Sequence, residues 1–88
     1  MPYIKTSDRD RLDYVTDVVH TVGIKDAGEL NYLITQLCIA YMHDNGKRYQ
    51  KINDVVGALE GAKMEFYRRY AAPYEDDKIN ENGDVYFL

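Results

Sequence analysis

The stretch INDVVGALEGAKMEFYRRY, residues 52–70, decides the fold because its apolar residues recur at helical spacing. They follow one another at steps of three or four: Ile52, Val55, Leu59, Ala62, Phe66 and Tyr70. Such steps place the side chains on one face of an α-helix. They predict a helix over about residues 50–71. Pro73 should end it, because proline lacks the amide proton that a helix interior needs.

Two further helices are predicted upstream of this stretch. In the first, Ser7 is the expected N-cap and Gly23 the expected end, and its apolar face consists of Leu12, Val15, Val19 and Val22. In the second, Asp26 and Glu29 resemble a capping box, and Asn45-Gly46 is the expected end. Its apolar stripe consists of Leu30, Leu33, Ile34, Leu37, Cys38 and Tyr41. We therefore expect an all-α protein, a compact three-helix domain over residues 1–72 with an ordered C-terminal extension over residues 73–88.

Small residues form two ridges on the third predicted helix. Gly57 and Gly61 lie four residues apart, as do Ala58 and Ala62. Each glycine costs about 1 kcal/mol of helix propensity relative to alanine, which suggests a compensating role. The ridges predict a close backbone approach by another helix, either from this chain or from a second copy.

Composition and charge narrow the class of protein. Eighty-eight residues with 45% hydrophobic content are enough for one folded domain. Residues 1–72 are electrically neutral, so the whole net charge of −4 comes from the C-terminal segment, residues 73–88. A neutral body with an acidic tail does not favour binding to DNA or RNA. There is no apolar run long enough to span a bilayer and no apolar signal-peptide region, so we expect a cytoplasmic protein without membrane contact.

Residues that often bind metals or form disulfides are too few or wrongly spaced. Cys38 is the single cysteine and lies within an apolar stripe, so we expect an inert, buried thiol. His20 and His43 fall on different predicted helices, without further ligands at metal-binding spacing. The tail fails as a calcium loop because Lys78 takes the position of the first ligand. We expect no metal and no cofactor.

An enzyme is not expected either. Glu60 and Glu65 are the carboxylates nearest to a catalytic pair, but five residues apart on a helix they point to different faces. The sequence also lacks a glycine-rich phosphate loop. A non-catalytic binding function fits these residues better.

The strongest candidate for a binding site surrounds Pro73. Arg68 and Arg69 offer bidentate donors for a carboxylate or phosphate, and aromatic rings stack on planar bases. The rings are those of Tyr67, Tyr70 and Tyr74. In the alternative interpretation, the arginines pair with Glu65, Asp76 or Asp77 and hold the C-terminal segment on the helix. The apolar end of that segment, residues 85–88, should dock on its own helices or on a neighbouring subunit.

Four blocks of the chain together resemble one protein family. They are MPYIK at 1–5, AGELNY at 27–32, INDVVGALEGAK at 52–63 and EFYRRYAAPYEDDKINENGDVY at 65–86. The resemblance is to small hypothetical proteins of bacteria, archaea and tailed phages, and it extends over nearly the whole chain. It implies a context rather than an activity.

The phage context suggests a ligand. In size and in its helical, Tyr- and Arg-bearing composition, the chain is similar to small oligomeric phage proteins that sequester cyclic-nucleotide signals of bacterial immunity. That similarity implies that Arg68 and Arg69 contact phosphates while the tyrosines stack on bases. Base or ribose edges would be read by Asn31, Asn53, Asn82 or Asp84. We therefore expect a homo-oligomeric, non-catalytic protein that sequesters such a ligand in the host cytoplasm. The alternative is a protein-interaction module that inhibits a host protein.

Overall fold

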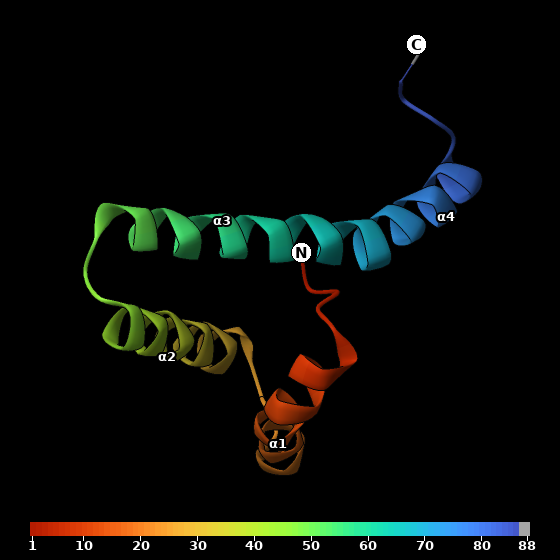
Figure 1. Ribbon diagram of the computed structural model, residues 1–88. Coiled ribbons are helices and arrows are strands. Elements are labelled where there is room, and N and C mark those ends of the chain that lie inside the picture. The colour runs from red at the N-terminus through yellow and green to blue at the C-terminus, as the bar shows by residue number, and fades with distance from the viewer. Residues whose placement is uncertain (87–88) are drawn as a thin grey trace.

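The computed structural model describes residues 1–86, in which four α-helices follow one another (Figure 1). They are α1 (Thr6–Val22), α2 (Ala27–Asn45), α3 (Tyr49–Phe66) and α4 (Ala72–Asn82). A five-residue π-helical turn, η1 (Tyr67–Ala71), joins α3 directly to α4. The predicted all-α fold is confirmed: α1, α2 and α3 are the three expected helices, and the ordered C-terminal extension contains α4.

The predicted N-caps differ in outcome. Asp26 caps α2, because its Oδ1 accepts a hydrogen bond from the Glu29 backbone N–H at 2.8 Å. Glu29 Oε1 in turn accepts from the Lys25 backbone N–H at 2.8 Å, which completes a variant of the capping box. The prediction for α1 is wrong. That helix begins at Thr6, and Lys5 occupies the N-cap without a side-chain cap, so Ser7 lies inside the first turn.

Glycines end three of the helices. Gly23 and Gly46 follow α1 and α2 at φ of 82° and 84°, and Gly83 follows α4 at φ of 89°. Positive φ is strained for residues with a Cβ atom, so a glycine fits each of these ends. The predicted ends at Gly23 and Gly46 are confirmed.

Pro73 does not end the helical path. We expected it to end the third helix, but residues 72–82 continue the path as α4. Proline is tolerated in the first turn of a helix, where an amide proton has no partner. Its ring would clash with the carbonyl of Arg69 in a continuous α-helix. The preceding turn is widened instead, and the Ala72 N–H donates to the carbonyl of Tyr67, five residues back.

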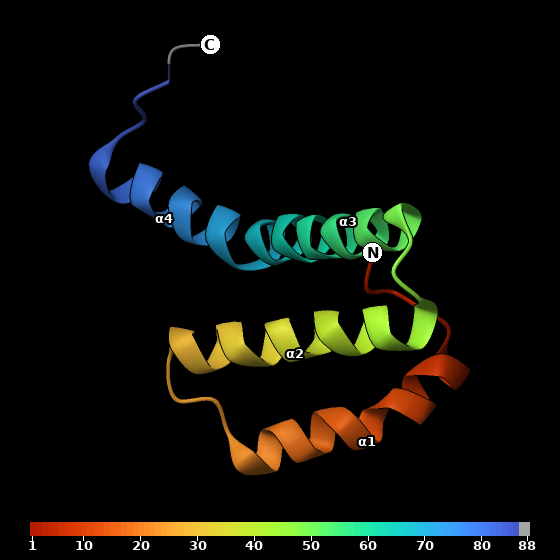
Figure 2. The same cartoon turned by 90° about the vertical axis from the view of Figure 1, so that its left-hand side faces the viewer.

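The packed pair of helices is the α2–α3 hairpin (Figure 2). The Tyr41 hydroxyl donates to Asp54 Oδ2 across the two helices at 2.9 Å, and Gln50 Nε2 donates to Asp54 Oδ1 at 2.9 Å. α1 lies beyond α2 and runs across α3 rather than along it (Figures 1 and 2). Within the described residues, no Cα atom of α1 comes within 8 Å of one in another helix.

Packing within one chain is loose. The radius of gyration is 17.1 Å, whereas a globular chain of this length has a value of about 12 Å. No side chain among residues 1–86 is fully buried. Cys38, which we expected to be buried, is half-buried on α2. The apolar stripes predicted from the sequence therefore exist, but one chain covers them only in part.

The C-terminal segment extends the rod formed by α3 and η1. α4 bends away from α2 in both views and, among the described helices, contacts η1 alone (Figures 1 and 2). Asp84 Oδ1 accepts a hydrogen bond from the Tyr86 backbone N–H at 2.9 Å, which forms a tight turn after Gly83. Phe87 and Leu88, which belong to the predicted apolar end at residues 85–88, lie outside the described residues. Docking of this segment on a neighbouring subunit stays a prediction.

Candidate functional site

The widened turn η1 carries four of the predicted site residues. Tyr67, Arg68, Arg69 and Tyr70 follow one another on it, and their side chains are largely exposed. The Tyr70 ring stacks on Phe66 with a centroid distance of 4.7 Å and an interplanar angle of 19°. η1 therefore presents two guanidinium groups beside aromatic surface.

Both arginines share one carboxylate oxygen. Glu65 Oε1 lies 2.9 Å from Arg68 Nη2 and accepts from Arg69 Nε at 3.2 Å. This is the Glu65 pairing of the alternative interpretation. In the part of the chain that is described, neither Asp76 nor Asp77 pairs with the arginines. The arginines are thus held by their own helix and not by the acidic tail.

The charges of this cluster shift two pKa values. Partial desolvation raises the pKa of Glu65, but the hydrogen bonds and charges of Arg68 and then Arg69 outweigh it. The net pKa of Glu65 lies below its ordinary value. Tyr3, and after it Glu65, favour the charged guanidinium and raise the pKa of Arg69. The cluster carries two positive charges and one negative charge at neutral pH.

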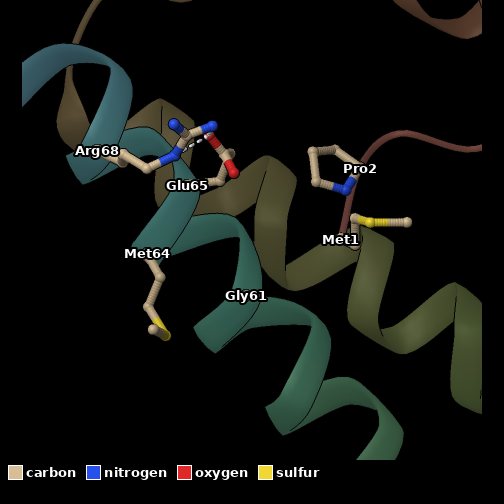
Figure 3. Close-up of a pocket in the computed structure, with 6 residues that line it drawn as sticks. All are labelled: Met1, Pro2, Gly61, Met64, Glu65 and Arg68. Carbon is tan, nitrogen blue, oxygen red and sulfur yellow. Dashed lines mark hydrogen bonds and ion pairs between the residues drawn. The ribbon is translucent and has the colours of Figure 1, made fainter.

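A first hollow, of about 340 Å³, lies beside this cluster (Figure 3). Its lining consists of Met1, Pro2, Gly61, Met64, Glu65 and Arg68. The N-terminal residues run against α3 here, and a Cβ added to Gly61 would lie 3.4 Å from the backbone nitrogen of Met1. The close approach predicted for the glycine ridge therefore exists at Gly61, but an extended segment makes it and not a helix.

A second hollow, of about 450 Å³, lies between η1 and the end of α4. Tyr67, Asn82 and Asp84 all line it, so three predicted site residues meet there. Lys78 lines it as well, and its Nζ lies 5.5 Å from the ring centroid of Tyr74. Neither hollow is enclosed, and each is open to solvent on one side.

Two predicted residues lie elsewhere. Asn31 is on α2, where its carbonyl and side chain accept from Thr35 Oγ1. Asn53 is in the first turns of α3, about 22 Å along the helix from Arg68 at 1.5 Å per residue. Within a single chain, neither residue joins the arginine cluster.

The N-terminal residues were not predicted to take part in the site. Met1 and Pro2 line the first hollow, and Tyr3 raises the pKa of Arg69. Gly61 was the one sequence signal for this contact, because a glycine inside a helix often marks a close approach. This glycine indicated a close approach to the helix but did not identify the segment that makes it.

Two properties of residues 1–86 bear on other classes of function. No helix in that range is both long and apolar enough to cross a bilayer. In the same range, histidine, cysteine and acidic side chains do not gather in groups of three that would suit a metal ion.

Comparison with known proteins places the chain in a family. No match was found among the curated proteins or among the solved structures. A protein family does match, from residue 1 to residue 85, which is nearly the full chain. The chain therefore belongs to the family described as Domain of unknown function (DUF6899).

Proposed function

We propose that this protein is a non-catalytic binding protein that captures a small anionic, nucleotide-like ligand at η1. The observation that carries the proposal is the sharing of one Glu65 carboxylate by two arginines that remain exposed beside aromatic rings. Arg68 and Arg69 are the phosphate contacts in this proposal, and Tyr67, Tyr70 and Tyr74 are the stacking surfaces.

Charge balance supports an anionic ligand. Two guanidinium groups face one carboxylate, so one positive charge is uncompensated at the turn. The Arg68 and Arg69 side chains are 63% and 60% exposed. Each guanidinium has five N–H donors, and Glu65 engages only part of them. The remaining donors suit the bidentate recognition of a phosphate.

The backbone of the turn supports a binding role as well. π-Helical turns are rare in proteins and frequently occur at functional sites. Here the widened turn lies just before Pro73 and sets the two arginines on consecutive, exposed positions. The aromatic pair Phe66–Tyr70 borders them and offers a flat face of the kind on which bases stack.

The ligand class follows from the resemblance to small phage proteins. A cyclic di- or trinucleotide, as used in bacterial immune signalling, combines phosphates with planar bases. In this proposal the protein acts as a homo-oligomer in the cytoplasm of an infected host and sequesters such a signal. Asn82 and Asp84, which line the hollow beside Tyr67, are the candidates for reading base or ribose edges.

The test is a thermal-shift screen followed by calorimetry against cyclic di- and trinucleotides and ADP-ribose. A ligand present at about 100 times its Kd stabilises the fold by about 2.7 kcal/mol, which gives a clear rise in Tm. Arg68→Ala and Arg69→Ala should each weaken binding at least about tenfold, since each removes charge-assisted hydrogen bonds. Lys63→Ala is the matched control, because Lys63 is an exposed cation on the same helix, paired with Glu60.

Glu65→Gln separates a ligand site from a purely structural cluster. Glu65 competes with an incoming anion for the same two guanidinium groups, so its neutralisation should tighten binding of the nucleotide. A structural role predicts only a lower Tm, without a gain in affinity. A flat response of the wild-type protein to the whole panel would refute the proposed ligand class.

A protein-interaction module that inhibits a host protein is the second candidate. The exposed apolar side chains favour it, because large exposed apolar patches mark interaction sites. Capture of one specific host protein, together with the flat nucleotide response, would support this function over the first.

A further inference from the structure

One face of α3 is apolar and only partly covered. Ile52, Leu59 and Phe66 recur every seven residues along it, and their exposed fractions are 46%, 42% and 63%. The hairpin contact with α2 and the N-terminal segment both use the side of α3 that carries Asp54 and Gly61, which are seven residues apart. A seven-residue apolar repeat is the seam by which one helix packs along another. We call these three residues the α3 seam.

The exposed area of the chain is too large for a folded monomer. The chain exposes 8096 Å², whereas a folded monomer of 10.2 kDa exposes about 5,300 Å². The excess, about 2,800 Å² per chain, is on the scale of an obligate homodimer interface. The described residues contain no buried side chain, so the missing core has to form against a partner that is always present with the chain.

The two ends of the α3–η1–α4 rod carry opposite charges. Glu75, Asp76 and Asp77 lie at the start of α4, while Lys47 and Arg48 lie in the turn before α3. Within residues 1–86 none of these five side chains forms an ion pair. The rod spans about 45 Å from Lys47 to Asp77 at 1.5 Å per residue, so the two groups cannot neutralise each other in one chain.

We propose that the α3 seam binds the α3 seam of a second copy of this chain, in antiparallel orientation. A two-fold axis at Leu59 pairs Ile52 with Phe66 of the partner subunit. It also sets Lys47 opposite Ala71 of the partner subunit, one helical turn from the partner's Glu75. Each acidic α4 then meets the basic turn of the other copy, and the interface is self-complementary, as a two-fold dimer requires.

Glu65 and Gly61 lie on a different side of α3 from Ile52 and Leu59, but Phe66 belongs both to the seam and to the aromatic pair beside the arginines. Mass and cross-linking are measured without ligand, so they report on the seam alone. The dimer can therefore fail while ligand capture stands, or the reverse.

Complementary charge reversal tests the antiparallel pairing. One variant carries Glu75→Lys with Asp76→Lys, and the other carries Lys47→Glu with Arg48→Glu. Each variant alone should dimerise about tenfold more weakly at low salt, because both end contacts become repulsive. An equimolar mixture should recover the wild-type affinity as a heterodimer, because both end contacts are then attractive. Circular dichroism of each variant checks that the helices remain.

Cysteine cross-linking locates the two-fold axis without depending on affinity. In a Cys38→Ser background, Leu59→Cys should form an interchain disulfide under mild oxidation, whereas Met64→Cys, exposed but away from the seam, should not. A mixture that fails to recover dimerisation, or equal cross-linking at both positions, would overturn the proposal. So would a wild-type mass of one chain at every concentration. Recovery of a different protein on the seam would likewise exclude the second copy as its occupant.

Discussion

The two sides of the apolar stripe on α3 have the same kinds of residue and different surroundings. On the side next to Asp54, Val55 is half-buried, and Asp54 itself accepts hydrogen bonds from Tyr41 and Gln50. On the other side, Leu59 and Phe66 have 42% and 63% of their surface exposed. Both sides belong to the single stripe that the sequence predicts.

The difference teaches what periodicity can and cannot specify. Apolar residues at steps of three and four require that a helix face be covered, since burial is the main source of helical stability in proteins. They do not state which element covers it. α2 covers part of the stripe because the Asn45-Gly46 turn folds it back onto α3, and we propose that a second copy covers the rest.

Truncation on the uncovered side should have the largest effect. Leu59→Ala removes the side chain at the proposed two-fold axis from both copies, at about 2 kcal/mol per chain. We expect a marked fall in dimer affinity and a Tm that depends more steeply on protein concentration. Equilibrium unfolding at several concentrations measures this. If the Tm of the variant depends on protein concentration as that of the wild type does, the seam has no role in dimerisation.

Truncation on the covered side should be smaller and of a different kind. Val55→Ala removes two methyl groups of a half-buried side chain next to Asp54, at about 1.5 kcal/mol or less. Because this contact lies within one chain, the loss should be the same at every protein concentration. Urea unfolding compares it directly with Leu59→Ala. If the two variants respond alike to dilution, the two sides of α3 do not differ as described.

The glycine ridge offers a smaller, matched pair. Among the described residues, no atom lies within 4 Å of a Cβ added to Gly57, whereas Gly61 faces Met1 at 3.4 Å. Gly57→Ala should stabilise the protein by about 1 kcal/mol through helix propensity. Gly61→Ala should gain less, because the N-terminal segment has to shift. An equal gain from both variants, measured by thermal unfolding, would argue that the N-terminal segment does not pack on α3.

Lowering the pH should destabilise the covered side of α3, and this is the smallest of the expected effects. Hydrogen bonds from Gln50, then Tyr41, together with nearby positive charges, hold the pKa of Asp54 below its ordinary value of 3.8. A depressed carboxyl pKa stabilises the folded state above the unfolded-state pKa, and this contribution is lost as pH falls through the folded-state pKa. We expect the Tm to fall below about pH 4, and Asp54→Asn to remove part of that dependence. Identical pH profiles for the variant and the wild type would exclude Asp54 as a cause.

Local features of the fold were predictable from the sequence, and non-local ones were not. Asp26, Gly23 and Gly46 mark helix ends through bonds and dihedral angles of a few neighbouring residues. Pro73 was misjudged because its clash with the Arg69 carbonyl has two solutions, a break or a widened turn, and the chain adopts the second.

The candidate site was predicted only where it is continuous in sequence. Tyr67 to Tyr70 lie together because they are neighbours on η1. Met1 and Tyr3 reach the arginine cluster from the far end of the chain, a contact that no local pattern encodes. Asn31 and Asn53 were grouped with the cluster by chemical type alone, and in one chain they lie apart from it.

The molar mass in solution, measured by light scattering over a dilution series, tests most directly whether two chains complete one core. The account predicts twice the 10.2 kDa mass of the chain at high concentration. It also predicts a loss of helical circular dichroism as dilution separates the copies, because one chain alone lacks a core. A mass of 10.2 kDa with full helicity at every concentration would contradict it.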